Sequence, residues 1–219
     1  MQVVLVDTRC RRGTMISLIV DPTSTDYTSV YKLLIGSVVP RPIAFVSTVN
    51  PEGAFNVAPF SFFTVASSNP PVLVFTVGRR ATPDPCKDTL RNILSAREFV
   101  VNVVSEEIGE KMNLCAGEYP PEVDEFELSG LTPIPSDLVK APRVAESHIN
   151  MECRLLYTIE MSGLTNGGNL VLGEVIRIHI DDACVSNYRI DPDKLRAIGR
   201  MAGNTYTRTQ DRFDMIRPA

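Results

Sequence analysis

The sequence predicts a mainly β protein in which antiparallel strands form a closed or sandwiched sheet with a few short helices. Hairpins carry the prediction: one turns at Asn50–Gly53 between two extended segments, and another turns through the glycine-rich residues 162–168. Strands do not alternate with helices along the chain, and this order argues against a doubly wound α/β sheet.

The first half of the chain predicts a helical turn, a hairpin and a buried strand. Residues 30–36 predict a helical turn that a glycine ends. Residues 41–49 are rich in β-branched side chains, and residues 54–58 resume an extended chain after the turn. Residues 72–77 are continuously apolar, which predicts a strand buried on both faces.

The second half predicts further helices and strands around one long loop. Asp84 and Pro85 suit the cap and the first position of a helix over residues 84–96. The other predicted elements are a strand at 99–104, a helix at 106–115, a loop at 117–143, strands at 147–161 and 170–182, and a short helix near 193–200.

The composition is that of one globular domain of ordinary size, with an appendage at most. The chain has 219 residues, of which 44% are hydrophobic and 22% are charged. Its net charge of −4 argues against nucleic-acid binding driven by overall charge. Eight acidic residues and one lysine lie between Ser105 and Ser129, so the remainder is mildly basic. This pattern suits a small anionic ligand, and a solvated acidic loop explains it equally well.

Cysteine usage and the apolar runs indicate a cytoplasmic protein. The five cysteines are widely scattered and form no C-x-x-C, which argues against a disulfide framework and against a zinc site. No apolar run approaches the roughly 18 residues of a membrane span. Residues 15–20, after three arginines, are too few for a signal peptide. A real start at Met15, with residues 1–14 as an upstream reading extension, stays open.

Motifs of several enzyme classes are absent from the sequence. It contains no G-x-G-x-x-G, no P-loop and no G-x-S-x-G, which argues against a Rossmann nucleotide site. Its two histidines, His148 and His179, are too few for a multi-histidine metal site. Strand alternation places His179 with Val175 and Arg177, which predicts a solvent-facing or interface histidine.

Residues 56–63 hold three of the nine phenylalanines beside proline and small polar residues, in a predicted loop that closes at 67–71. One interpretation is structural, with the rings plugging one end of a barrel. The other is a slot for a planar ligand, with Phe and Pro walls and with Ser and backbone N–H groups at the ring edge. Lys87 and Thr89 at a helix start predict a phosphate seat, although basic residues are common at such positions.

Seven stretches occur in one order along the chain. They are SVVPRPIAFVST at 37–48, NVAPFSFF at 56–63, KDTLRN at 87–92, EFVVN at 98–102, DEF at 124–126, GLT at 130–132 and LGEV at 172–175. In this order they resemble the flavin reductase-like family of FMN-binding split-barrel proteins, the branch that includes flavoredoxin. The resemblance covers about residues 30–206.

The resemblance implies an antiparallel split β-barrel domain over residues 29–219, after a poorly matched extension at 1–28. It also implies a homodimer with FMN in a cleft at the interface. Ser47 and Thr48 match contacts to the ribityl-phosphate, and residues 58–61 match the isoalloxazine edge. The implied cofactor-binding residues are Arg41, Ser47, Thr48, Asn56, Ala58, Pro59, Phe60, Ser61, Ser67, Ser68, Asn69, Lys87, Asp88, Thr89 and Tyr206.

The implied activity is hydride transfer from NADH or NADPH to the flavin, with electrons passed to free flavin, a monooxygenase or another acceptor. No catalytic side chain and no metal are required, because hydride moves directly between the two cofactors. Two alternatives stay open: an FMN-containing electron carrier without its own NAD(P)H turnover, and a binding protein that has lost redox activity. Residues 147–153 depart from the apolar run expected there, which leaves the substrate open. No nucleic-acid or membrane partner is implied.

Overall fold

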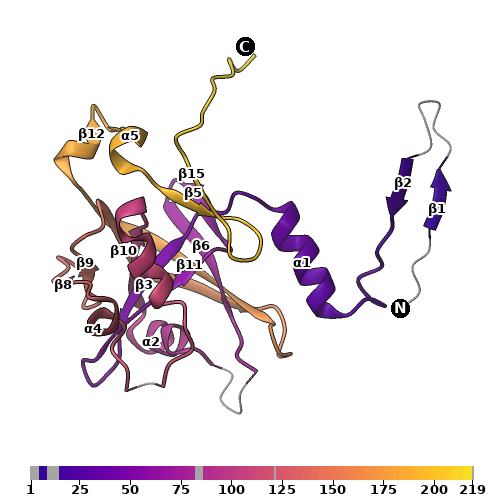
Figure 1. Ribbon diagram of the computed structural model, residues 1–219. Helices are drawn as coiled ribbons and strands as arrows, with labels where there is room; N and C mark the ends of the chain where they lie inside the picture. The colour runs from indigo at the N-terminus through magenta and orange to yellow at the C-terminus, as the bar shows by residue number, and fades with distance from the viewer. Residues whose placement is uncertain (1–4, 9–14, 82–85, 121, 219) are drawn as a thin grey trace. The chain divides into compact units, whose positions relative to one another are not determined.

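The computed structural model describes residues 5–8, 15–81, 86–120 and 122–218, and it divides the chain into two compact units (Figure 1). The smaller unit comprises residues 1–39 and 201–205. In it, β1 (Leu5–Thr8) pairs antiparallel with β2 (Met15–Leu18), and α1 spans Tyr27–Ser37. Asp26 caps α1 by accepting a hydrogen bond from the Ser29 N–H at 3.0 Å. The predicted boundary between residues 28 and 29 stays a prediction.

The larger unit, residues 40–200 and 206–219, contains a seven-stranded antiparallel sheet. Its strand order is β4-β3-β7-β10-β11-β6-β5. The strands are β3 (Ala44–Val49), β4 (Phe55–Phe60), β5 (Phe63–Ser68), β6 (Pro71–Gly78), β7 (Glu98–Val103), β10 (Ile149–Glu160) and β11 (Gly168–Ile180). The mainly β, antiparallel prediction is confirmed. A closed barrel is not formed among the described residues, because no ladder joins β4 to β5.

Both predicted hairpins are confirmed. Between β3 and β4, the Asn50 side chain accepts from the Ala54 N–H at 2.8 Å, and Gly53 takes the left-handed conformation with φ +89°. The β10–β11 hairpin requires a glycine at position 173 in β11. A Cβ there would lie 2.3 Å from the Cζ of Phe99, so only the absence of a side chain lets this ring pack against the strand.

The two larger of three apolar clusters pack against the sheet. On one face, the rings of Phe60 and Phe99 each lie 5.4 Å from that of Phe75, and α2 (Asp88–Ala96) adds Ile93. The second cluster joins β3 and β4 to three helical pieces: η1 (Glu106–Ile108), α3 (Gly109–Leu114) and α4 (Glu125–Ser129). Removing a buried ring from such a cluster costs about 3–5 kcal/mol.

Several predicted boundaries were wrong. The predicted helical turn at 30–36 is part of α1, which continues through Gly36. The start of the helix predicted at Asp84 lies outside the described residues, and α2 begins at Asp88. Residues 56–63 form β4 and the start of β5 instead of a loop. Because β4 is an edge strand, Pro59 is tolerated there without an N–H.

The predicted loop at 117–143 contains α4 and two short strands, β8 (Pro133–Ile134) and β9 (Arg143–Val144). After β11 come η2 (Asp182–Cys184), β12 (Val185–Ser186) and β13 (Arg189–Ile190). The helix predicted near 193–200 is only α5 (Pro192–Leu195). Arg196, in the left-handed conformation at φ +47°, ends it, and β14 (Ile198–Arg200) pairs with β15 (Tyr206–Arg208).

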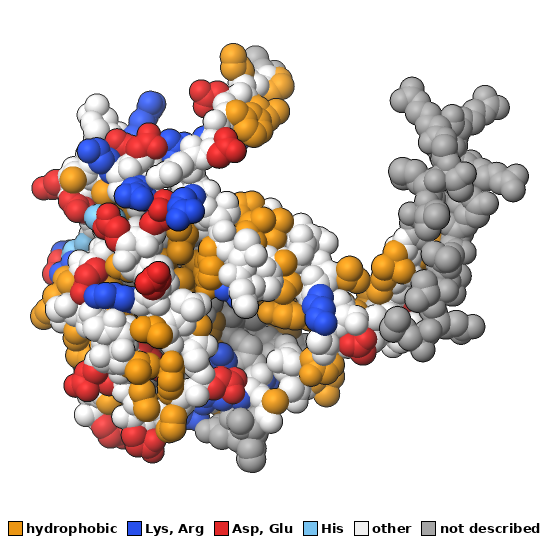
Figure 2. Space-filling view, in the orientation of Figure 1, with side chains coloured by type: hydrophobic (Ala, Val, Ile, Leu, Met, Phe, Trp, Pro, Cys, Tyr) orange, Lys and Arg blue, Asp and Glu red, His pale blue; other side chains and the backbone are white. Residues whose placement is uncertain are grey.

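Charged side chains of both signs are interspersed over the visible face (Figure 2). Arg196 and Arg208, for example, each lie 3.0 Å from the same carboxylate oxygen of Glu106. Among the residues that the structure describes, no helix is both long and apolar enough to cross a membrane.

Candidate functional site

Lys87, at the N-terminus of α2, forms no ion pair with any carboxylate that the structure describes. Lys87 caps the helix through its backbone alone, so the first N–H groups of α2 have no side-chain acceptor among the described residues. Asp88 pairs with Arg80 at 2.9 Å and with Arg91, whereas Lys87 forms no ion pair with the described residues. Burial lowers the pKa of Lys87, against the opposing charge of Glu118, because the ammonium group has lost part of its hydration.

A polar network links this helix to β4. The Asn56 side chain donates to Glu125 Oε1 at 2.9 Å and accepts from the Thr89 hydroxyl at 2.8 Å. Thr48 Oγ1 lies 3.4 Å from the same Asn56 oxygen and accepts from Asn92 at 3.0 Å. Because the Thr89 proton is donated to Asn56, the backbone N–H of Thr89 is the donor left for a ligand.

The structure brings six of the predicted cofactor residues to one small cavity. They are Asn56, Ala58, Pro59, Lys87, Asp88 and Thr89. Asn56, Asp88 and Glu125 also line an adjoining cavity of about 290 Å³. The combination of a flat proline wall, open helix N–H groups and a partly desolvated cation suits a planar ligand that carries a phosphate.

Ser47 and Thr48 are both fully buried and do not line this cavity. The Ser47 hydroxyl donates to the Pro142 carbonyl at 2.5 Å and accepts from Asn102 at 3.0 Å. Thr48 reaches the cavity only through Asn56. Contact of either side chain with a ribityl-phosphate stays a prediction.

The remaining predicted residues lie outside this cavity. Arg41 is buried, with its Nε 3.5 Å from Ser61 Oγ and its guanidinium 5.9 Å from the centre of the Phe62 ring. Phe60 is in the apolar cluster described above. Ser67 and Ser68 end β5, and the Asn69 N–H donates to Ser67. The Tyr206 hydroxyl donates to Asn113 at 3.0 Å, and its ring stacks 4.5 Å below the Arg200 guanidinium.

Glu125 and Cys115 are cavity residues that sequence reasoning did not assign to the site. Burial raises the pKa of Glu125, because the charged carboxylate has lost much of its hydration. Burial also raises the pKa of Cys115 to about 11, so this cysteine stays a neutral thiol. Glu125 lies in the matched stretch 124–126, but the resemblance implied no binding role for that stretch.

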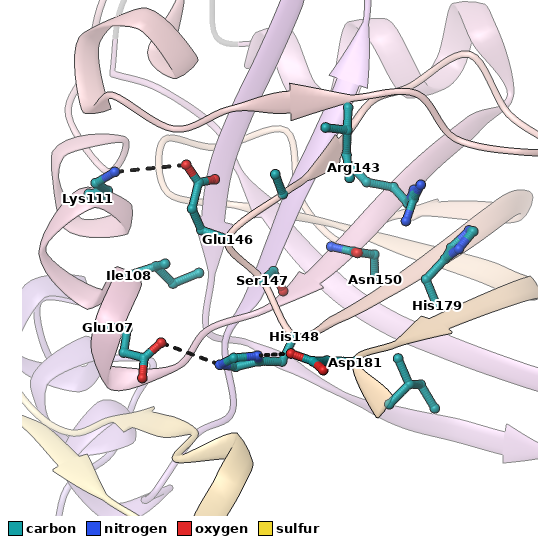
Figure 3. Close-up of a pocket in the computed structure, with 13 residues that line it drawn as sticks. Glu107, Ile108, Lys111, Arg143, Glu146, Ser147, His148, Asn150, His179 and Asp181 are labelled. Carbon is teal, nitrogen blue, oxygen red and sulfur yellow. Dashed lines mark hydrogen bonds and ion pairs between the residues drawn. The ribbon is translucent and has the colours of Figure 1, made fainter. Parts of the chain in front are cut away.

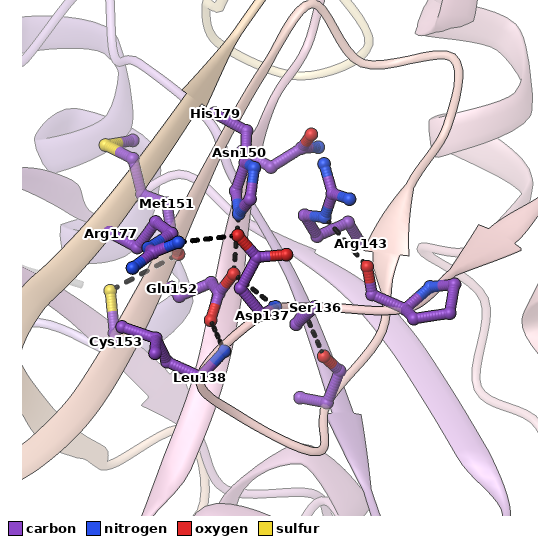
Figure 4. Close-up of polar contacts among 12 residues, drawn as sticks. Ser136, Asp137, Leu138, Arg143, Asn150, Met151, Glu152, Cys153, Arg177 and His179 are labelled. Carbon is purple, nitrogen blue, oxygen red and sulfur yellow. Dashed lines mark hydrogen bonds and ion pairs between the residues drawn. The ribbon is translucent and has the colours of Figure 1, made fainter.

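His179 is half-buried instead of solvent-facing, and the alternative of an interface histidine stays a prediction. Its Nε2 lies 2.6 Å from Oε1 of Glu152, which is fully buried (Figure 4). Glu152 also accepts from the backbone N–H groups of Asp137 at 2.8 Å and Leu138 at 2.7 Å. Burial opposes ionisation, but these N–H donors and the histidine hold the pKa of Glu152 below its usual value. Glu152 therefore holds the loop at Asp137–Leu138 against the sheet and also binds His179.

A separate cavity of about 760 Å³ lies beside this pair (Figure 3). Both histidines of the chain, His148 and His179, line it together with Lys111 and Arg143. Its walls come from α3, β9 and the ends of β10 and β11 that lie next to each other in the ladder.

Comparison with known proteins gives the family. The model of the flavin reductase like domain matches residues 35–196. Nitrilotriacetate monooxygenase component B from Bacillus cereus is 36% identical, with a TM-score of 0.86 over 93% of this chain and 100% of that one. The 2-nitrobenzoate 2-nitroreductase NbaA of Pseudomonas fluorescens is 33% identical, with a TM-score of 0.82 over 91% and 96% of the two chains.

A more distant structure agrees in fold. A putative flavin reductase with a split barrel domain from Shewanella frigidimarina is 21% identical and has a TM-score of 0.77 over 90% of this chain and 96% of that one. With residues 35–196 matched in order, the chain belongs to the flavin reductase-like family.

Proposed function

We propose that this protein binds FMN and transfers hydride from NADH or NADPH to that flavin. Family membership makes it a flavin-dependent oxidoreductase. The observation that carries the choice of FMN is the anion-binding site at the start of α2, where partly buried Lys87 lies beside helix N–H groups that no described side chain caps. One phosphate group satisfies that seat.

The residues at this seat divide the work of binding. Lys87 and the first N–H groups of α2 bind the phosphate, and each charge-assisted hydrogen bond is worth about 1.5–3 kcal/mol. Asp88 is already neutralised by Arg80 and Arg91, so it repels a phosphate less than a free carboxylate would. Glu125 fixes the Asn56 amide, which in turn fixes Thr89.

The flavin, when bound, supplies the hydride-accepting chemistry, and the chain supplies orientation and exclusion of water. Residues Ala58 to Ser61, which run along the edge strand β4 into the following turn, offer backbone groups and a flat proline to the isoalloxazine edge. No side chain has to exchange a proton with the substrate during hydride transfer.

We also propose a homodimeric split barrel in which a second copy completes the cofactor cleft, since open sheet edges at β4 and β5 leave the barrel unclosed. A monooxygenase is the proposed electron acceptor, because the similar Bacillus cereus protein is component B of such an enzyme.

A second candidate function is electron transfer without NAD(P)H turnover. Tyr206, an aromatic residue among the predicted cofactor-binding residues, is engaged by Arg200 on its face and by Asn113 at its hydroxyl. Because these contacts already occupy the ring and hydroxyl of Tyr206, they favour an electron carrier over a reductase.

One measurement tests the cofactor, and a second separates the two functions. Mass spectrometry of the ligand released on denaturation is expected to detect FMN, and a colourless protein that takes up no added FMN would end the cofactor proposal. Anaerobic stopped-flow absorbance is expected to show bleaching of bound FMN by NADH or NADPH within seconds. If dithionite reduces the flavin but neither nucleotide does, the protein is the carrier.

A further inference from the structure

His148, Asp181 and Cys184 form a cluster outside the flavin seat. One ligand atom from each lies within 4.8 Å of the other two. His148 is distant in sequence from Asp181 and Cys184, but backbone hydrogen bonds hold the three residues together. The Asp181 N–H donates to the His148 carbonyl at 2.9 Å where β10 begins and β11 ends, and the Cys184 N–H donates to the Asp181 carbonyl at 2.8 Å.

The side chains are also oriented. Asp181 Oδ1 accepts from the Ala183 N–H at 2.9 Å, which turns Oδ2 toward His148 Nδ1 at 3.1 Å. The other ring nitrogen of His148 faces Glu107 Oε2 at 3.5 Å, so the imidazole lies between two carboxylates (Figure 3). Metal-bound histidines commonly donate their second ring N–H to a carboxylate, which fixes the tautomer.

Cys184 gives an independent observation. Its side chain is buried, with 1% of the residue exposed, and its thiol forms no hydrogen bond with the described residues. The carboxylates of Asp181, Asp191 and Glu107 surround this thiol and make its environment negative. A soft, unpartnered ligand in a negative environment suits a thiophilic divalent cation.

We propose that His148 Nδ1, Asp181 Oδ2 and Cys184 Sγ bind one Zn²⁺ ion, with Glu107 as a positioning residue for His148. Zinc bonds of about 2.0–2.3 Å place tetrahedral ligand atoms about 3.3–3.8 Å apart, so the present cluster needs only small side-chain shifts. The thiol releases its proton to solvent as the sulfur–zinc bond forms. The fourth position is left for water.

The second cluster of this kind, formed by Asp137, Glu152 and His179, is a poorer site. Glu152 already accepts two backbone N–H groups and the His179 ring, and Asp137 is paired with Arg177. The carboxylate oxygens of this second cluster therefore already have partners within the protein. The scattered cysteines gave no zinc signature in the sequence, because the cluster takes one cysteine, three residues after Asp181, and a histidine from the opposite strand end.

The test uses the full chain as purified, with its bound flavin, after treatment with a chelator. Zn²⁺ competition against a chromophoric chelator is expected to give one ion per chain with a dissociation constant below about 10 µM. Cd²⁺ is expected to produce thiolate-to-metal absorption in the ultraviolet difference spectrum, in which the flavin cancels.

Variants decide whether this cluster holds the ion. Asp181→Asn and Cys184→Ser are expected to weaken Zn²⁺ binding at least about tenfold, Cys184→Ser to abolish the Cd²⁺ band, and Glu107→Gln to weaken binding about tenfold. The matched control His179→Gln, on the same cavity, is expected to stay within about twofold. Binding weaker than 1 mM in the parent protein, or equal affinity in all four variants, would overturn the proposal.

Discussion

Ser47 and Thr48 are neighbours in β3 and are equally buried, yet they belong to polar networks of different kinds. The Ser47 network closes on itself: Asn102 donates to Ser47 and to the Phe45 carbonyl, and its oxygen accepts from Val144 and Asn150. A buried network satisfied in this way stabilises the scaffold.

The Thr48 network ends differently. It runs through Asn56 to Thr89 and Glu125, and it opens at a cavity beside Lys87, which has no ion pair among the described residues. Unused donors and an unpaired cation at the end of a rigid network are the features of a binding site. We therefore expect the Asn102 side of the sheet to stabilise the scaffold, and we propose that the Asn56 side binds the ligand.

The largest expected effect is on stability. Asn102→Ala leaves the buried hydrogen-bond partners of the amide unsatisfied, and each unsatisfied group costs about 1–3 kcal/mol. The free energy of unfolding is therefore expected to fall by about 3 kcal/mol or more. Urea unfolding measures this, with the exposed Asn204→Ala as the control. An unchanged urea midpoint would remove the scaffold role of Asn102.

Lys87→Ala tests the open network. Loss of the ammonium group is expected to weaken FMN binding at least about tenfold. The free energy of unfolding is expected to change by about 0.5 kcal/mol or less, because Lys87 forms no ion pair with the residues that the structure describes. Fluorescence titration of the apoprotein measures the affinity. The exposed Lys140→Ala is the matched control and is expected to bind FMN as the parent does.

Glu125 gives the open network a pH dependence. Its pKa is raised in the folded protein, so the folded state holds a proton that the unfolded state has lost. Stability is therefore expected to fall as pH rises from the ordinary glutamate pKa toward the raised value. Glu125→Gln is expected to remove this slope in urea unfolding between about pH 4 and 7. A difference between the two proteins that is constant with pH would contradict the assignment.

The smallest expected effects compare the two neighbours directly. Ser47→Ala is expected to lower the free energy of unfolding by about 1 kcal/mol and to leave FMN affinity unchanged. Thr48→Val is expected to weaken FMN binding about threefold, because Asn56 loses a supporting hydroxyl. The reverse pattern would mean that the two faces of β3 have exchanged roles.

Local chemistry explains what the sequence could predict. The turn at Asn50–Gly53 and the position of Lys87 at the start of α2 depend on residues only a few positions away. The sequence therefore predicted both positions. The continuation of β4 through Pro59 and Phe60 was missed because a proline disfavours a strand unless the strand is at an edge, and edge position is a property of the whole sheet.

The misassigned side chains depend on distant segments. His179 follows the expected alternation, but the loop at Asp137–Leu138 covers that face and supplies N–H groups to its partner Glu152. Glu125 meets Asn56 across a separation of 69 residues. No periodic pattern in the sequence encodes either contact. The fold as a whole could be predicted because seven sequence stretches match the family in order.

The central claim is that the seat at α2 recognises a phosphate, and comparing FMN with riboflavin, which lacks it, tests that claim directly. Affinities of both flavins for the parent protein and for Lys87→Ala form a double cycle. The account predicts that the parent prefers FMN by at least about tenfold and that Lys87→Ala loses most of this preference while its riboflavin affinity is unchanged. An equal loss of affinity for both flavins, with the preference intact, would contradict it.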